Sequence, residues 1–201
     1  MKNILILYPD LFNCFSKFER KVKNITGDIE EFNISYLRDS NKLVSEYVNT
    51  ANNICIVEQV MQIDNSGLTH AIIFDDGESF NDEIKIISSL KIPLRIIKVT
   101  VTRVINIKKE IEFKGIKSTA NYEYIGRGSY WGNPHSMFEE GDDREEVIRK
   151  YKYDFDFEKF PHIDKSEVHK LAGKKLGCFC KPATCHGDIL ADFLNEYDDG
   201  K

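Results

Sequence analysis

The sequence predicts an α/β protein in which a Rossmann-like parallel-sheet first part is packed on a smaller α/β second part. In the first part, short apolar stretches typical of buried strands alternate with stretches whose apolar residues recur at helical spacing. In the second part, most of the unusual residues are concentrated in a glycine-rich loop and a cysteine-rich segment. No stretch rich in Gly, Ser or Pro lies near Val99–Arg103, so we expect two domains, 1–100 and 101–201, without a flexible linker.

The elements of the first part follow from apolar patterns. The run Ile4–Leu7 predicts a buried strand, and phenylalanines at helical spacing predict a helix over Leu11–Val22. Further buried strands are expected at Asn53–Val57, Ala71–Phe74 and Leu94–Val101, with a helix over Glu83–Leu90. Ligands of such sheets lie beyond the carboxyl ends of the strands, where the acidic segment Asp75–Ser79 is expected.

The second part has weaker patterns. Charged residues alternate with apolar ones over Thr102–Asn121, which is typical of a solvated strand pair. Acidic residues at the start of Asp142–Tyr151 and basic residues at its end match a helix dipole. We also expect a short helix over Ser166–Ala172, a strand at Leu176–Phe179 and a final helix over Asp188–Tyr197.

Composition excludes several classes of function. The chain has 201 residues and a net charge of −5, with only local basic pairs, which disfavours a nucleic acid partner. We find no apolar run long enough to span a membrane and no export signal, so we expect a cytoplasmic protein. Its five cysteines are then expected to be reduced, with Cys14 and Cys55 in the core. The sequence is compatible with a homo-oligomer.

Two segments of the second part carry a family resemblance. Tyr124–Pro134 and Gly173–Asp188 closely resemble a bacterial and phage family called domain of unknown function 4326. The family's pattern also includes an opening strand, here Arg103–Asn106, and an Arg-Glu-Glu helix start, here Arg144–Glu146. The resemblance covers roughly Thr102–Asn195, and it implies a domain boundary and a site but no reaction.

The first part is more distantly similar to the Rossmann-type nucleotide-binding superfamily of DNA-processing protein A and the cytokinin-activating phosphoribohydrolases. Met1–Leu7, His70–Gly77 and Lys91–Ile97 carry this similarity. That superfamily usually has a Gly-Ser loop after the first strand, where this chain has Tyr8–Leu11. Pro9 has no N–H to donate and no glycine admits a phosphate, a departure that disfavours phosphate binding and hydrolase activity in this part.

The glycine loop of the second part has the composition of an anion site. The glycines of Gly126-Arg127-Gly128-Ser129 allow backbone N–H groups to converge, and Arg127 offers a bidentate contact to a phosphate. Trp131 offers a stacking face for a base, and Asn133 offers a polar edge. The alternative is a tight structural turn, with Trp131 in the core and Arg127 in an ion pair.

The cysteine segment allows three interpretations. Cys178, Cys180, Cys185 and His186 make a complete tetrahedral zinc set, but the usual Cys-x-x-Cys spacing is absent and two adjacent residues do not easily aim at one ion. Alternatively, Cys185 is a reactive or ligand-contacting thiol, because it precedes the helix that starts near Asp188. The third interpretation is purely structural thiols.

These features favour a protein that binds a nucleotide-type small molecule, needs no cofactor and sequesters a nucleotide signal. The residues expected to bind it are Gly126, Arg127, Gly128, Ser129, Trp131, Asn133, Cys180, Cys185 and His186. One alternative is an enzyme that acts on an N-glycosidic or phosphoester bond, with Cys185, His186 and Asp188 as candidate catalytic residues. The other is an interaction module. For both the binding protein and the enzyme, we expect the side chains of the glycine loop to converge on the segment Cys180–Asp188.

Overall fold

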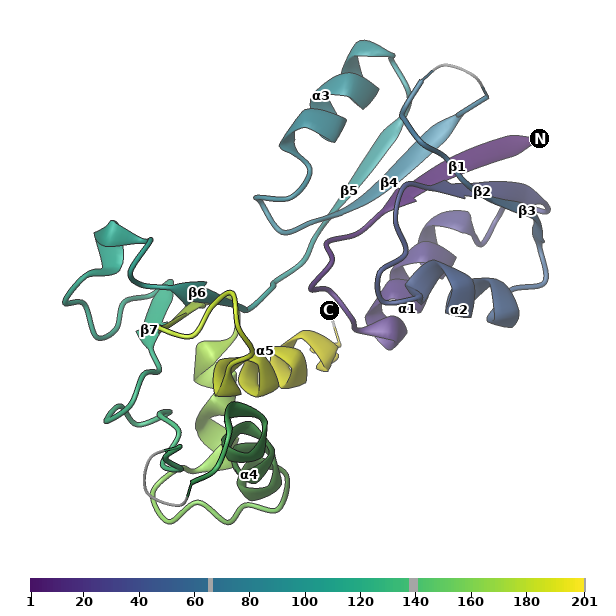
Figure 1. Cartoon of the computed structure of the whole chain (residues 1–201). Helices are drawn as coiled ribbons and strands as arrows, with labels where there is room; N and C mark the ends of the chain where they lie inside the picture. Colours follow the sequence, from purple (N-terminus) through teal and green to yellow (C-terminus); the bar gives the residue numbers. More distant parts are fainter. Residues whose placement is uncertain (65–66, 138–140, 201) are drawn as a thin grey trace. The chain divides into compact units, whose positions relative to one another are not determined.

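Two parallel β-sheets organise the chain, one in each half, which confirms the predicted α/β class (Figure 1). The computed structural model describes residues 1–64, 67–137 and 141–200. Its contacts divide the chain into a first unit, Met1–Val99 with the C-terminal residues from Glu196, and a second unit, Thr100–Asn195.

The first unit has a five-stranded parallel sheet in the order β3-β2-β1-β4-β5. Its strands are β1 (Lys2–Leu7), β2 (Phe32–Tyr36), β3 (Ile54–Gln59), β4 (His70–Asp75) and β5 (Leu94–Lys98). Its helices are α1 (Phe15–Thr26), α2 (Leu43–Thr50) and α3 (Asn81–Ser89). α3 lies on one face of the sheet, and α1 and α2 lie on the other (Figure 1).

The central strands β1 and β4 are apolar on both faces because helices cover both sides of the sheet. On one face, Leu5 and Ile73 pack in a core cluster with Ile87 of α3. On the opposite face, Phe18 of α1 stacks on Phe74 of β4, with ring centroids 5.0 Å apart. The continuous apolar runs in the sequence therefore correspond to strands with two buried faces.

Three details of the first unit differ from the sequence-based expectations. β2 and α2 were not predicted, and α1 begins at Phe15 because Pro9 opens a turn in which Phe12 N donates to Pro9 O at 2.9 Å. β3 is an edge strand, because it pairs with β2 only. Most of its side chains are exposed. Cys55 on this strand is consequently exposed, whereas Cys14 is buried as expected.

The second unit has a three-stranded parallel sheet in the order β6-β8-β7. Its strands are β6 (Arg103–Asn106), β7 (Tyr122–Tyr124) and β8 (Lys175–Cys178). Its helices are α4 (Arg144–Asp156), α5 (His186–Glu196) and the 3₁₀ turns η1 (Ile111–Phe113) and η2 (Lys165–Leu171). A separate core includes Leu176 of β8, Tyr151 of α4 and Leu190 of α5.

The predicted strand pair over Thr102–Asn121 is wrong. β6 and β7 do not pair with each other, because β8 enters between them from much later in the sequence and pairs with both. The helix predicted over Asp142–Tyr151 exists but runs from Arg144 to Asp156. It is capped by Asp143, whose carboxylate accepts a hydrogen bond from Glu146 N at 2.8 Å.

None of the helices formed by the described residues is long and apolar enough to cross a membrane.

Candidate functional site

A cavity of about 190 Å³ lies within the second unit, where the glycine loop, the start of α4 and the cysteine segment meet. The predicted site residues that line it are Gly126, Arg127, Asn133, Cys178, Cys180, Cys185 and His186. Gly128, Ser129, Trp131 and Asp188 do not line it. The glycine loop and the cysteine segment therefore contribute to one cavity, although not through every residue that was expected there.

The glycine loop is a pair of tight turns. Ser129 N donates to Gly126 O at 3.0 Å, and Gly132 N donates to Ser129 O at 3.1 Å. Gly128 has a φ of 82°, a left-handed conformation that favours glycine. The N–H group of Ser129, one of those expected to form an anion cradle, is thus used within the loop.

Trp131 and Asn133 hold the loop in place. Trp131 is 4% exposed and belongs to the core cluster of the second unit, so its ring offers no open face to the cavity. This placement corrects the stacking role expected for Trp131, because the ring packs under the loop. Asn133 lines the cavity, but its Nδ2 donates to Val147 O at 3.0 Å and its Oδ1 accepts from His135 N at 2.9 Å.

Two arginines face the cavity from different elements. Arg127 makes two long contacts with described residues, from Nη1 to Ser136 Oγ at 3.4 Å and from Nη2 to His135 O at 3.5 Å. Arg144 is the first residue of α4, and its Nη1 donates to Thr184 O at 3.4 Å. Neither guanidinium pairs with a carboxylate within the described ranges 1–64, 67–137 and 141–200.

Sequence reasoning did not identify Arg144 as a site residue, although a signal existed. A cation in the first turn of a helix is disfavoured by the helix dipole, so an arginine there calls for a reason other than helix stability. It also did not identify the walls Val147, Ile148 and Phe179. Phe179 is 50% exposed, which is unusual for a phenylalanine and marks the rim of the cavity.

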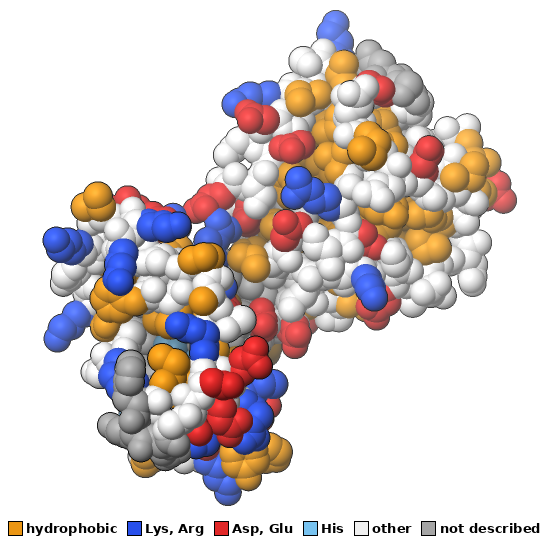
Figure 2. All heavy atoms as spheres, in the orientation of Figure 1, with side chains coloured by type: hydrophobic (Ala, Val, Ile, Leu, Met, Phe, Trp, Pro, Cys, Tyr) orange, Lys and Arg blue, Asp and Glu red, His pale blue; other side chains and the backbone are white. Residues whose placement is uncertain are grey.

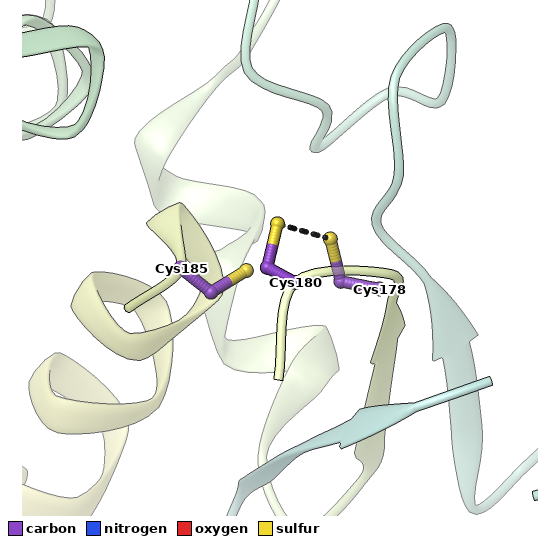
Figure 3. Close-up of side chains that lie close together, drawn as sticks. All are labelled: Cys178, Cys180 and Cys185. Carbon is purple, nitrogen blue, oxygen red and sulfur yellow. Dashed lines mark hydrogen bonds between the residues drawn. The ribbon is translucent and has the colours of Figure 1, made fainter. Parts of the chain in front are cut away.

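The three cysteines of the segment lie together. The sulfurs of Cys178, Cys180 and Cys185 are all within 4.8 Å of one another, and the first two are 3.5 Å apart. Cys178 ends β8, Cys180 lies in the following loop, and Cys185 immediately precedes α5. In Figure 3 the sulfurs of Cys178 and Cys180 lie side by side, and the sulfur of Cys185 is directed toward Cys180.

The thiols influence one another's ionisation. The Cys185 thiol donates a hydrogen bond to Cys178, which lowers the pKa of Cys178 below that of an ordinary thiol. The same hydrogen bond, together with burial, raises the pKa of Cys185. Burial and the neighbouring Cys178 thiolate raise the pKa of Cys180. Cys178 is therefore the most acidic of the three thiols.

His186 is the first residue of α5 and is buried. Its Nε2 lies 2.9 Å from Ile125 O, which can only accept, so Nε2 carries the proton. Its Nδ1 lies 3.7 Å from the Cys185 sulfur. Burial lowers the pKa of His186, so the ring is neutral at neutral pH with an unprotonated Nδ1.

The start of α5 is capped by the chain itself. Gly187 N donates to the Cys185 sulfur at 3.4 Å, and Cys185 N donates to Asp188 Oδ2 at 2.9 Å. The other carboxylate oxygen of Asp188 pairs with Lys181 Nζ at 2.6 Å. The N–H groups expected to be free at Gly187 and Asp188 are thus occupied, since Asp188 N also donates to Cys185 O. Asp188 acts as a helix cap outside the cavity.

The carboxyl edge of the first sheet is also closed by its own side chains. The Asp39 carboxylate accepts hydrogen bonds from Tyr8 Oη at 2.6 Å and from Val44 N at 2.9 Å. The Asp39 carboxylate therefore occupies the position at the start of α2 where a bound anion would lie. After β4, Ser79 Oγ donates to Asp76 at 2.9 Å, which folds the acidic loop onto itself.

The comparisons with known proteins confirm both resemblances found in the sequence. The domain of unknown function DUF4326 matches residues 105–196. An uncharacterized 12.4 kDa protein from the nrdA-td intergenic region of Enterobacteria phage T4 is 42% identical over 72 residues. The matched part is 35% of this chain and 65% of the phage protein, slightly less than two thirds of its length.

No solved structure matches the chain. The minimal SLOG domain matches residues 1–105, which is more than half of the sequence. The chain therefore belongs to the minimal SLOG domain family.

Proposed function

We propose that the cavity of the second unit binds a nucleotide-type small molecule, with a phosphate held by Arg127 and Arg144. The observation that carries the proposal is that two guanidinium groups line one cavity, and neither has a carboxylate partner among the described residues. Arginine binds phosphate through two parallel N–H donors, so two arginines together match a doubly charged phosphate.

The long contacts of the arginines suit this role. Protein hydrogen bonds of the N–H···O type are usually shorter than about 3.2 Å. The contacts of Arg127 and Arg144 to oxygen atoms are 3.4–3.5 Å long and go to neutral groups, and the Arg144 guanidinium also contacts the Cys180 thiol. Because only these long contacts to described residues hold Arg127, its side chain can turn onto an incoming anion at small cost, and Arg144 can join it by exchanging its contact with Cys180.

The size of the cavity indicates which part of the ligand it holds. Sites for drug-sized ligands are usually about 300–1,000 Å³. The cavity here has about 190 Å³, so it accommodates one moiety of a nucleotide. Val147 and Ile148 form an apolar wall suited to a base or sugar, and Phe179 at the rim offers the stacking face that Trp131 lacks.

The charge distribution supports a small ligand. On the face drawn in Figure 2, Lys and Arg side chains are interspersed with Asp and Glu. A nucleic acid backbone is usually bound by a continuous basic surface. The membership in the minimal SLOG family is compatible with a nucleotide-related role.

We further propose that the ligand is captured without being converted, so that the protein sequesters a nucleotide signal. The residues that an enzyme would use here already have structural partners. The Cys185 sulfur caps α5, the His186 Nε2 bonds to Ile125 O, and Asp188 pairs with Lys181 outside the cavity. A nucleophile needs an accessible atom and an activating base, and Cys185 is only 1% exposed.

The experiment is equilibrium dialysis of the purified chain against AMP, GMP and cyclic AMP, with mass spectrometry of small molecules released from the protein. Arg127→Ala and Arg144→Ala should each weaken binding at least about tenfold, which is about 1.4 kcal/mol. The matched control is Arg149→Ala on α4, whose guanidinium is engaged by Glu146 at 2.6 Å and is absent from the cavity.

Equal losses in all three variants, or no binding in the unmodified chain, would contradict the proposal. Chromatography of the bound nucleotide after prolonged incubation tests capture without turnover, since an enzyme would release a changed product.

A further inference from the structure

We infer that Cys178, Cys180 and Cys185 bind one tetrahedral Zn²⁺ ion, with Nδ1 of His186 as the fourth ligand. The inference is independent of the nucleotide proposal, because it concerns the wall of the cavity and needs no nucleotide. It assigns a metal to the cysteine segment, which the spacing in the sequence disfavoured.

The separations of the sulfurs fit one ion. With Zn–S bonds of about 2.3 Å and tetrahedral angles, two thiolates on the same zinc lie about 3.8 Å apart. The sulfurs of Cys178 and Cys180 are 3.5 Å apart, and all three lie within 4.8 Å of one another. Small side-chain rotations are therefore enough to close the set. In an iron–sulfur cluster the cysteines bind different iron atoms, which requires sulfurs spread more widely.

The two adjacent residues lie close to each other, although His186 is outside the group of ligand atoms that are all within 4.8 Å of one another. Zn–N bonds of about 2.0 Å place a histidine nitrogen about 3.5 Å from a thiolate on the same zinc. Nδ1 of His186 lies 3.7 Å from the sulfur of Cys185. Sequence reasoning set this pair aside because neighbouring side chains usually diverge. Here the chain turns into α5 between them, since Cys185 is the residue before the helix and His186 is its first residue.

The second ring nitrogen of His186 is already placed as in a metal site. Histidines that bind metals nearly always donate the other ring N–H to a carboxylate or a backbone carbonyl, which fixes the tautomer. Nε2 of His186 lies 2.9 Å from Ile125 O. This contact leaves Nδ1 as the unprotonated nitrogen, and Nδ1 is the ring nitrogen near the Cys185 sulfur.

The surroundings balance the charge of the proposed centre. Three thiolates and a neutral imidazole give a Zn²⁺ centre one net negative charge. The guanidinium of Arg144 lies beside Cys180, and Arg127 lines the same cavity. Soft thiolate ligands select zinc over magnesium or calcium. The ion would join the end of β8 to the start of α5 and so fix the back wall of the cavity.

The test uses the full chain, reduced and reconstituted with Zn²⁺ alone, followed by elemental analysis of the zinc retained after desalting. The chain should retain about one zinc. Cys178→Ser and Cys185→Ser should each retain less than about a fifth of that amount. Cys55→Ser, which removes an exposed thiol of the first unit, is the matched control and should retain the full amount.

A cobalt titration of the unmodified chain keeps the test valid if a serine variant does not fold. Co²⁺ should produce a thiolate-to-metal charge-transfer band and strong tetrahedral d–d bands, both removed by added Zn²⁺. In His186→Ala the charge-transfer band should persist while the d–d bands shift. Absence of these bands, substoichiometric zinc in the reduced chain, or equal zinc loss in Cys55→Ser would each overturn the inference.

Discussion

Gly132 determines the shape of the loop that presents Arg127 to the cavity. A Cβ atom at this position would lie 2.6 Å from Gly126 O, 3.2 Å from Ser129 O and 3.3 Å from the Cα of Arg127. All three are backbone atoms, so they cannot rotate away as a side chain would. Any residue other than glycine must therefore open the turn.

We expect Gly132→Ala to lower the free energy of unfolding of the second unit by about 1–3 kcal/mol, the usual cost of overpacking. The control is Ser129→Ala in the same loop. Its hydroxyl is buried and has no hydrogen-bond partner among the described residues, so its removal should change stability by less than about 0.5 kcal/mol. Denaturation followed by fluorescence measures both, because Trp131 is the single tryptophan and lies in this unit. Equal stability of the two variants would refute the argument.

The residues of the site also show what a sequence can predict. The loop could be predicted from Gly126, Arg127 and Gly128, because the backbone freedom of glycine and the charge of arginine do not depend on neighbouring elements. The role of Trp131 depended on what packs around it, and the same ring suits a core or a ligand. Arg144 was missed because its partner segment, near Thr184, is forty residues away along the chain.

Among the elements, α2 depends on a carboxylate from outside the helix. Asp39 accepts hydrogen bonds from Val44 N, Ser45 N and Ser45 Oγ at 2.6–2.9 Å, and from Tyr8 Oη. Burial alone would raise the pKa of Asp39. These hydrogen bonds outweigh that effect, and the pKa of Asp39 is lowered. The ionised form is therefore the one that stabilises the first unit.

Asp39→Asn should consequently destabilise the first unit at neutral pH by about 1 kcal/mol, the usual cost of losing a helix cap. Because the folded pKa lies below the unfolded value of about 3.9, the stabilisation is complete above that pH and is lost as the pH falls through the folded pKa. Hydrogen exchange of α2 amides in both proteins measures the difference. A difference that grows as the pH falls below about 4 would contradict this assignment.

Strand prediction succeeded where the sequence has a continuous apolar run and failed for β2, where polar residues interrupt the run. β1 and β4 are central strands, and their continuous apolar runs reveal them. β2 was missed because its buried Ser35 resembles a surface residue in the sequence. Ser35 Oγ donates to Asn3 Oδ1 at 3.0 Å, a contact that only the neighbouring strand provides. α2 was missed because it has only eight residues and takes its cap from Asp39.

At the scale of the whole chain, two core clusters lie entirely within separate units. Ile73 belongs to the cluster of the first unit and Leu176 to that of the second, and both are fully buried. The cavity proposed to bind a nucleotide and the cysteine cluster are built, among the described residues, from residues of the second unit. Stability of the proposed site should therefore depend on the second core.

We expect Leu176→Ala to lower the stability of the second unit by about 2–5 kcal/mol, because deletion of a buried leucine side chain leaves a cavity. The transition detected by Trp131 fluorescence should move to lower denaturant, and nucleotide binding should fail at lower temperature. Ile73→Ala is the matched substitution in the other core, and it should raise hydrogen exchange in β1 and β4 while leaving the Trp131 transition in place. If Ile73→Ala shifted that transition as far as Leu176→Ala does, the two cores would unfold as one. The proposed site would then depend on the minimal SLOG unit for its stability, even though that unit contributes no residue to its walls.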